Sequence, residues 1–256
     1  MLIADLLVFP LVSRQSGVYF FDVGQGDSAL IKTPNNKIIL IDGGPDNSVL
    51  FELGKALSFY RRRIDFIIVS HYHDDHIAGL IEILNRYKVK KIIYPADSPS
   101  SEISESLLSG ARTRNVPIFF LSQSAVLRFT DDCNLLVLSP LILDVPFDDN
   151  NSLIAKLDCR QKSFLFTGDS NTKVEKALLL LNQDWRADVF KASHHGSLTA
   201  NSELFLRAVN PQLLIISVGA DNRFGHPHPS ILERAADLGL KVKRTDQEGT
   251  VIIKFD

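Results

Sequence analysis

The sequence predicts a mixed α/β fold in which helices cover stacked β-sheets, and three observations support this. Short runs rich in Val, Ile, Leu and Phe, typical of buried strands, recur along the chain. Other segments carry apolar residues at helical spacing, as in 77–87, where Ile77, Leu80, Ile81 and Leu84 share one face. Several strands precede each helix, which favours sheets covered by helices over a simple alternation of strand and helix.

The expected elements follow from these patterns. Strands are expected at 18–23, 28–33, 38–42, 66–70, 91–94, 118–121, 125–129, 135–138, 153–157, 163–167, 189–191, 213–218 and 251–255. Helices are expected at 49–60, 77–87, 101–115, 173–181, 202–209 and 231–238. Strands in each half end in polar clusters, 71–76 in the first half, and Asp169 with His194 and His195 in the second. Two stacked sheets would bring both clusters to one edge.

The composition is that of an ordinary globular protein. Hydrophobic residues make up 45% and charged residues 23% of the 256 residues, which excludes wholesale disorder. The net charge of −2 excludes binding of nucleic acid by overall charge, so any such contact has to be local. Cys133 and Cys159 are the only cysteines, which excludes a disulfide framework and a Cys-rich zinc module but leaves one disulfide open.

We expect a single domain over residues 1–256, because no repeat, low-complexity tract or long linker interrupts the sequence. Residues 2–12 are mostly apolar but contain Asp5 and Pro10. They are shorter than the roughly 20 residues of a membrane-spanning helix and lack the features of a signal peptide. We interpret 1–17 as an edge segment packed on the domain, with a truncated membrane anchor as the alternative. The sequence does not fix the compartment.

The histidines are the most informative residues, because all seven lie in three short clusters, at 71–76, 194–195 and 226–228. In an extended backbone His71 and His73 point the same way, while Asp75 and His76 begin the next helix. Two imidazoles can therefore bind one metal ion while a carboxylate and a third imidazole bind a neighbouring ion. These ligands suit zinc, manganese or iron. The alternative is a polar loop that caps a helix and carries unrelated histidines.

The motif His-x-His-x-Asp-His after a buried strand resembles that of the metallo-β-lactamase superfamily. Further segments resemble the C-terminal metallo-β-lactamase-like domain of ComEC-type competence DNA-uptake proteins, over about 18–253. They are FDVGQGDS at 21–28, LIDGG at 40–44, TGD at 167–169, SHHGS at 193–197, GHPHP at 225–229 and TDQEG at 245–249. The membrane channel and N-terminal domain of those proteins have no counterpart in these residues.

This resemblance implies a four-layer αββα sandwich with two divalent metal ions, Zn²⁺ or Mn²⁺, between the inner sheets. It implies that His71 and His73 bind one ion, that Asp75, His76 and His195 bind the other, and that Asp169 bridges the two. A bridging carboxylate is physically reasonable, since it offsets the repulsion of two cations about 3.5–4 Å apart. Gly168 allows the sharp turn before Asp169. Taken alone, TGD would be an ordinary turn at a strand end.

One departure from the superfamily pattern concerns the first ion. Many members place another histidine on it, before the bridging carboxylate, and this sequence has none between His76 and His194. The matching region is 150–152, and we expect Asn151 to lie beside the substrate there. An amide oxygen is a weaker zinc ligand than imidazole and suits manganese better. The first ion is therefore expected to be labile, partly occupied or manganese.

Other polar residues are expected around the centre. His194 and His195 cannot both face one point in an extended backbone, so we assign His195 to the metal and His194 to the substrate or to protonation of the leaving group. Prolines after His226 and His228 stiffen 225–229. We place His226 at the mouth of the site against a phosphate, with a rigid turn as the alternative.

Four further residues complete the expected site. Ser197 and Arg223 are expected to bind substrate. Asp27 and Asp42 are expected to orient the ligand histidines, and the alternative is that they only form turns. The basic run 61–63 and the lysines at 88, 90 and 91 are interpreted as solvated faces, because no aromatic residues interleave with them as on a platform for single-stranded nucleic acid.

The implied function is that of a metal-dependent hydrolase, with a phosphodiesterase or nuclease related to DNA uptake as the leading interpretation. A hydroxide that bridges the metals would attack phosphorus in single-stranded nucleic acid or another phosphodiester, with Asp75, His194 and His226 as the participating side chains. A membrane DNA-uptake channel is the expected partner. The alternatives are hydrolysis of a lactam, lactone or thioester, and a non-catalytic module that binds DNA or the channel.

Overall fold

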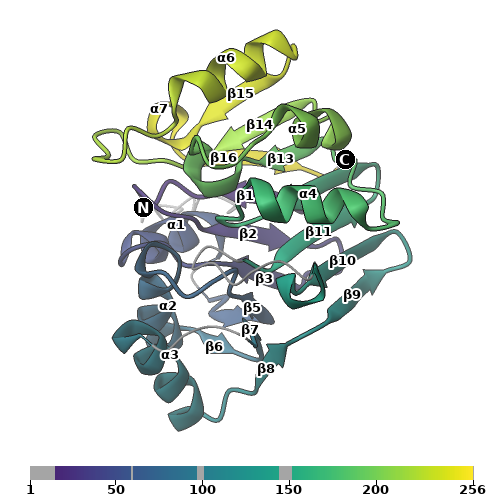
Figure 1. Cartoon of the computed structure of the whole chain (residues 1–256). Helices are drawn as coiled ribbons and strands as arrows, with labels where there is room; N and C mark the ends of the chain where they lie inside the picture. Colours follow the sequence, from purple (N-terminus) through teal and green to yellow (C-terminus); the bar gives the residue numbers. More distant parts are fainter. Residues whose placement is uncertain (1–14, 59, 97–100, 144–151, 256) are drawn as a thin grey trace, which may run out of the picture.

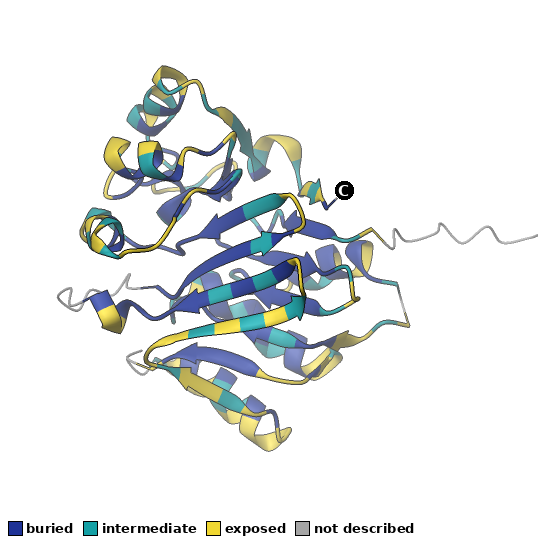
Figure 2. Cartoon of the chain, turned by 90° about the vertical axis from the view of Figure 1, so that its right-hand side faces the viewer, coloured by how far each residue is buried: buried dark blue, intermediate teal, exposed yellow. Residues whose placement is uncertain are grey.

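Two seven-stranded sheets lie face to face, and helices cover the outer face of each (Figure 1, Figure 2). The computed structural model describes residues 15–58, 60–96, 101–143 and 152–255. The mixed α/β class and the four-layer arrangement expected from the sequence are confirmed.

The first sheet combines an antiparallel and a parallel part. Its order is β16 (Val251–Lys254), β1 (Gly17–Phe20), β2 (Ala29–Lys32), β3 (Ile38–Ile41), β5 (Phe66–Ile68), β7 (Ile92–Pro95) and β8 (Ile118–Leu121). Strands β16 to β3 pair antiparallel, and β3 to β8 pair parallel. The helices packed on it are α1 (Ser48–Ala56), α2 (Asp74–Arg86) and α3 (Glu102–Thr113). The short strands β4 (Arg63–Ile64) and β6 (Lys88–Val89) form a separate pair.

The second sheet is built in the same way. Its order is β15 (Lys241–Arg244), β14 (Leu213–Ile216), β13 (Val189–Lys191), β12 (Lys162–Phe166), β11 (Ile154–Cys159), β10 (Cys133–Leu138) and β9 (Ser124–Thr130). The helices packed on it are α4 (Thr172–Leu180), α5 (Glu203–Val209) and α6 (Pro229–Asp237). Short helical turns are η1 (Pro140–Leu143), η2 (Ser193–Gly196) and α7 (Thr245–Glu248). Cys133 and Cys159 face each other on β10 and β11 and form the disulfide that the composition left open.

Three hydrophobic cores separate the four layers. Strand β3 shows why its sequence is apolar throughout: Ile39 and Ile41 face the core between the sheets, and Ile38 and Leu40 face the helices. Because successive side chains point to opposite faces and both faces are covered, alternation with polar residues disappears. The strand ends are then the places where polar side chains can gather.

A few boundaries differ from the expected ones. The helix expected at 49–60 ends at Ala56. Strand β15 was not expected, because its sequence KVKR alternates charged and apolar residues. It lies at the edge of the second sheet, where lysines protect an exposed strand from pairing with another chain.

The N-terminal prediction is only partly open to comparison. Residues 1–14 lie outside the described residues, and Gly17 already belongs to β1, which lies between β16 and β2 rather than at an edge. Among the described helices, none has the length and apolar character needed to cross a membrane. The single domain over 1–256 stays a prediction.

Two helical glycines differ sharply in the space around them. A Cβ on Gly79 of α2 would lie 2.1 Å from the carbonyl oxygen of Gly43, in the loop after β3. We expect Gly79→Ala to lower the free energy of unfolding by about 1–3 kcal/mol. A Cβ on Gly54 of α1 would meet nothing within 4 Å, and Gly54→Ala should raise stability by about 0.5–1 kcal/mol. Urea unfolding measures both, and a shift of the same sign in the two variants would contradict this packing.

Candidate metal centre

Strand ends from both sheets bring the expected ligands together. His71 and His73 follow β5 of the first sheet, while Asp169 follows β12 and His195 follows β13 of the second. Gly168, with φ +51°, makes the turn before Asp169, and a Cβ there would lie 2.5 Å from Ser152 Oγ. The convergence expected from the spacing of the polar clusters is therefore present.

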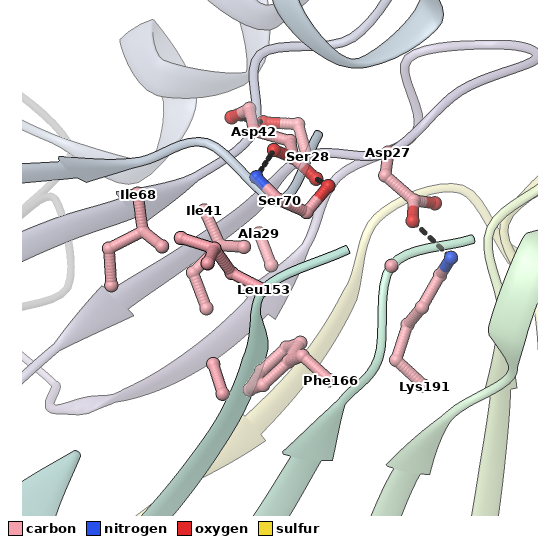
Figure 3. Close-up of a pocket in the computed structure, with 12 residues that line it drawn as sticks. Asp27, Ser28, Ala29, Ile41, Asp42, Ile68, Ser70, Leu153, Phe166 and Lys191 are labelled. Atoms are coloured by element: carbon pink, nitrogen blue, oxygen red, sulfur yellow. Dashed lines mark hydrogen bonds and ion pairs between the residues drawn. The ribbon is translucent and has the colours of Figure 1, made fainter. Parts of the chain in front are cut away.

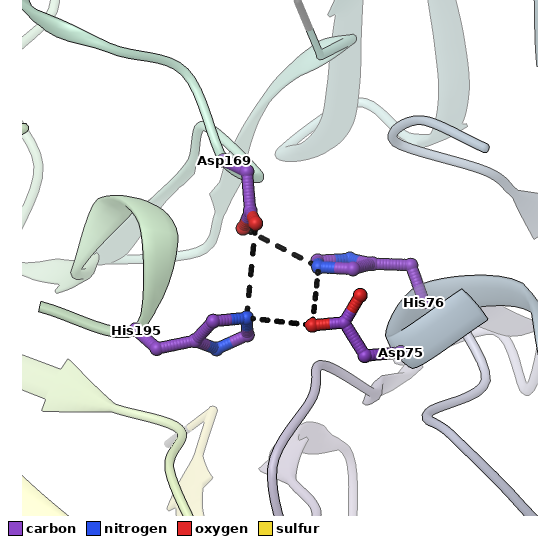
Figure 4. Close-up of side chains that lie close together, drawn as sticks. All are labelled: Asp75, His76, Asp169 and His195. Atoms are coloured by element: carbon purple, nitrogen blue, oxygen red, sulfur yellow. Dashed lines mark hydrogen bonds and ion pairs between the residues drawn. The ribbon is translucent and has the colours of Figure 1, made fainter. Parts of the chain in front are cut away.

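Three groups of donor atoms lie close together, and two of them share Asp169, while the third consists of Asp27, Asp42 and His76. The first, here called the Asp75 group, consists of Asp75, His76, Asp169 and His195, whose donor atoms lie within 4.8 Å of one another (Figure 4). His76 Nε2 is 3.3 Å from Asp169 Oδ1, and His195 Nε2 is 3.7 Å from Asp169 Oδ2. The second, here called the His71 group, consists of His71, His73 and Asp169. One carboxylate thus stands between two sets of nitrogen donors.

The buried donor atoms fit a bound cation. His71 Nε2, His76 Nε2 and Asp169 Oδ1 are buried and make no hydrogen bond of good geometry within the part of the chain that the structure describes, although the last two lie 3.3 Å apart. Unpaired buried polar atoms are costly, so three of them in one cluster call for an additional partner. Imidazole nitrogen with carboxylate oxygen is a donor set that suits Zn²⁺ or Mn²⁺. The residues present therefore fit the metal ions that the family resemblance implies.

The electrostatics of the cluster favour added positive charge. Burial acts to lower the pKa of His76, but Asp169, Asp42 and Asp75 outweigh burial and raise this pKa well above its ordinary value. Burial also opposes protonation of His195, yet the carboxylates, Asp169 foremost, raise its pKa to about 9. Burial acts to raise the pKa of Asp169, and the imidazoles, His76 foremost, hold it well below its usual range. Protons and metal ions compete for such atoms, so metal binding releases protons.

Asp42 contacts the far ring nitrogen of the expected ligand His76. It follows β3, accepts hydrogen bonds from the backbone N–H of Ser70 at 2.7 Å and from the Ser70 hydroxyl at 2.6 Å, and lies 2.9 Å from His76 Nδ1. This contact turns His76 Nε2 toward Asp169. A carboxylate on the far nitrogen of a ligand histidine fixes the orientation of the ring and raises its basicity. The geometry supports the orienting role expected for Asp42.

Asp27 occupies the matching position behind His195. Its Oδ1 lies 3.3 Å from His195 Nδ1, which also contacts the carbonyl oxygen of Ser217 at 3.0 Å, and its Oδ2 pairs with Lys191. Burial acts to raise the pKa of Asp27, but Lys191 and His195 lower it to about 2. Sequence reasoning missed Lys191. The feature that could have identified it is its position at the end of a short apolar strand, because a lysine buried there requires a buried carboxylate as partner.

A small cavity lies between the sheets behind the ligands (Figure 3). Its volume is about 20 Å³, which is room for one water molecule. Asp27, Asp42, Ser70 and Lys191 form its polar side. Its apolar side is formed by Ala29, Ile41, Ile68, Leu153, Ala155 and Phe166. A substrate cannot enter this space and has to approach from the opposite side.

That opposite side is the solvent-facing part of the cluster. His73 is half-buried, and the side chains of Asp75 and His194 are 33% and 25% exposed.

The expectation that His194 and His195 face different ways assumed an extended backbone, and this assumption is wrong. Both residues have left-handed backbone angles, with φ 49° and 53°, so that both Nε2 atoms approach Asp169 Oδ2, at 3.6 Å and 3.7 Å. Of the two, His195 belongs to the Asp75 group.

His226 lies at the rim, as expected from the sequence. Its ring centroid is 5.6 Å from that of His194 and 6.2 Å from that of His195. Burial, together with these two imidazoles, lowers the pKa of His226 to about 4. Both effects favour the neutral form of the His226 imidazole.

The remaining expected contacts have mixed outcomes. Arg223 is exposed in the same loop as His226. Ser197 is buried and its hydroxyl contacts Thr199 Oγ1 at 3.0 Å, so the structure places it in a local turn rather than at the rim. Asn151 lies outside the described residues.

Comparison with known proteins identifies the family. Residues 21–220 match the model of the metallo-beta-lactamase superfamily, and the chain belongs to this superfamily. Over 267 residues it is 31% identical to ComE operon protein 3 of Bacillus subtilis, which covers 98% of this chain and 34% of that protein. Over 256 residues it is 29% identical to Recombination protein 2 of Haemophilus influenzae, covering 98% of this chain and 30% of that protein. The chain thus spans about a third of the length of these relatives.

A solved structure supports the same fold. The metallo-beta-lactamase fold protein YhfI of Bacillus subtilis aligns with a TM-score of 0.59 at 12% identity, covering 94% of this chain and 100% of that one. The resemblance stated from the sequence motifs is confirmed. Family and donor set together support a metal-dependent hydrolase.

Proposed function

We propose that this chain hydrolyses phosphodiester bonds in single-stranded nucleic acid and uses two divalent ions, Zn²⁺ or Mn²⁺. The observation that carries the proposal is the pair of donor groups that share Asp169. Two ions held on one carboxylate suit an in-line displacement, in which the attacking and leaving oxygens both need charge stabilisation. His194 and His226 lie beside this pair, where the ester would be bound.

Each group of residues has a distinct task. The Asp75 group and the His71 group would hold the cations. Asp42 keeps the ring of His76 aimed at Asp169, and the Ser217 carbonyl oxygen, with Asp27 beside it, orients the ring of His195. Divalent ions bound in such a site lower the pKa of water to about 7 and stabilise charge on phosphoryl oxygens. In the reaction, water adds to phosphorus, the bond to the leaving oxygen breaks, and that oxygen gains a proton. We assign this proton transfer to His194 and contact with a phosphate oxygen to His226.

The choice of nucleic acid has separate support. One relative is named Recombination protein 2, and the motifs resemble those of DNA-uptake proteins. Because the net charge is −2, the substrate has to be held by local groups, and Arg223 is an exposed cation in the His226 loop. A membrane DNA-uptake channel is the proposed partner.

Replacing His194 tests its assignment. We expect His194→Ala to lower kcat for cleavage of labelled single-stranded DNA by about 10²–10⁴-fold while the metal content of the protein is unchanged, because His194 lies outside both donor groups. The matched control is His228→Ala, since the His228 side chain contacts Ser230 at the start of α6. Full cleavage by His194→Ala, or loss of metal from it, would contradict the assignment.

Substrate comparison tests the function itself. The metal-loaded protein should cleave single-stranded DNA and a chromogenic phosphodiester, and should leave a thioester and a β-lactam intact. Turnover of the thioester or lactam alone would favour the carbonyl hydrolase. Tight binding of DNA without cleavage, equal in His73→Ala, would favour a non-catalytic binding module.

A further inference from the structure

An exposed aromatic side chain lies at the rim of the metal centre. Phe224 is 56% exposed and belongs to the loop 217–228, between β14 and α6. Exposure alone does not indicate a binding site, because single apolar residues are common on protein surfaces. Its position is what sets Phe224 apart: its ring is nearly parallel to that of His226, at an interplanar angle of 21° and a centroid distance of 5.8 Å.

Successive ring contacts thus connect the metal centre with Phe224. The ring of His226 is stacked toward that of the ligand His195, 6.2 Å away at 30°. Phe224 is the next ring outward, so two ring-to-ring steps separate the metal centre from the exposed aromatic face.

Two side chains, Asn222 and Gln25, make hydrogen bonds to the backbone of the loop that carries Phe224. The Asn222 amide nitrogen donates to the carbonyl oxygens of Gly219, at 2.9 Å, and His226, at 2.6 Å, and its oxygen accepts from the backbone N–H of His226 at 2.9 Å. The N–H of Gly219 donates to Gln25 Oε1 at 3.2 Å. A loop fixed in this way presents Phe224 in a defined place, which lowers the entropic cost of binding a ligand.

A cation accompanies the aromatic ring. Arg223 Cζ lies 5.2 Å from the centroid of the Phe224 ring, and both side chains are exposed. A guanidinium plane stacks on nucleobases as well as on aromatic rings and also attracts phosphate. His226 lies beside one face of the Phe224 ring, and the Arg223 guanidinium lies over the ring. A base that stacks on Phe224 therefore takes the place of Arg223 there, and the exposed Arg223 side chain moves outward to cover the other face of the base.

We propose that Phe224 and Arg223 form a nucleobase subsite, in which an unpaired base stacks on Phe224 while the adjacent phosphate occupies the metal centre. This inference rests on the proposed function and names the residues that would bind a base of its single-stranded substrate. The face of a base is covered by its neighbours in a duplex but can be exposed in a single strand, so this subsite selects single-stranded nucleic acid. It selects by stacking and not by base identity, since every base has an aromatic face.

Binding is measured separately from cleavage. The probes are a fluorescently labelled oligothymidylate and an abasic backbone of the same length, both with phosphorothioate linkages that slow cleavage. Each is added to the metal-loaded protein and read by fluorescence anisotropy. We expect Phe224→Leu to weaken binding of oligothymidylate about 5–150-fold and to leave binding of the abasic backbone unchanged, while Phe224→Trp retains the wild-type affinity. The matched control is Phe51→Leu, because Phe51 on α1 is 67% exposed and also has a cation, Lys55, 4.0 Å from its ring centroid.

The outcomes separate the subsite from the catalytic proposal. No binding of oligothymidylate by the wild-type protein, an unchanged affinity in Phe224→Leu, or an equal loss with the abasic backbone would overturn the subsite. Cleavage of single-stranded DNA is then measured with metal present, where Phe224→Leu should raise KM and leave kcat unchanged. Base-dependent binding without any cleavage by the wild-type protein would refute the phosphodiesterase and leave the subsite standing.

Discussion

Asp169→Asn is expected to reduce cleavage of single-stranded DNA by at least about 10³-fold, since stabilisation by bound metal supplies several kcal/mol and each 1.36 kcal/mol is a factor of ten in rate. Asp169 is the one residue common to the Asp75 group and the His71 group among the described residues. An amide in its place keeps the size of the side chain but removes the negative charge between the two sets of imidazoles. The rate is measured at saturating Mn²⁺ and again at saturating Zn²⁺.

Asp188→Asn provides the control for Asp169→Asn. Asp188 directly precedes β13 of the second sheet, and its carboxylate accepts hydrogen bonds from the backbone N–H and hydroxyl of Ser163, both at 2.8 Å. Its hydrogen-bond partners among the described residues include no ligand histidine. We expect this variant to lose some stability and to retain its rate. A rate for Asp169→Asn within tenfold of the wild type would show that the carboxylate does not connect the two groups.

Asp42→Asn is expected to weaken metal binding by about 10–100-fold without unfolding the protein. The carboxylate accepts two hydrogen bonds from Ser70 and contacts His76 Nδ1, and an amide cannot act as acceptor to all three at once. His76 would then lose the contact that aims its Nε2 at Asp169. Competition with a chromogenic chelator measures the affinity, and circular dichroism confirms the fold.

Asp65→Asn is the matched control, because Asp42 and Asp65 are both buried carboxylates beside β3, Asp42 at its end and Asp65 at its start. Asp65 accepts a hydrogen bond from the backbone N–H of Ile38 and pairs with Arg63, with no imidazole in contact. It should lower stability without changing metal affinity. Equal metal affinities in Asp42→Asn and the wild type would show that His76 does not need the Asp42 contact to bind metal.

The convergence of the ligands was predictable from the sequence because it depends on strand ends. A buried strand is recognisable from its apolar run, and a polar cluster directly after it has to leave the core at that point. His71, Asp169 and His195 all follow this rule. The local backbone at His194 and His195 could not be predicted. Both residues have left-handed backbone angles, which non-glycine residues seldom adopt, and nothing in the sequence marks this conformation. An extended backbone was therefore expected from the sequence.

Contacts between residues far apart in the sequence were the other feature that could not be predicted. The contact of Lys191 with Asp27 joins residues 164 positions apart, and only the packing of the two sheets brings them together. Phe224 escaped notice for a related reason. Its only basic neighbour in the sequence is Arg223, and one arginine beside one aromatic residue does not indicate a binding platform. The significance of Phe224 comes from the stack with His226 and the distance of that ring from His195.

Counting the metal ions bound per chain tests the central claim most directly. Purified protein is equilibrated with Mn²⁺ or Zn²⁺, freed of excess metal by gel filtration, and analysed by mass spectrometry for metal and protein content. We predict about two ions per wild-type chain and a marked loss from Asp169→Asn, since both groups use that carboxylate. A wild-type chain that holds no divalent ion, or an Asp169→Asn chain that holds as many as the wild type, would contradict a paired centre built on Asp169.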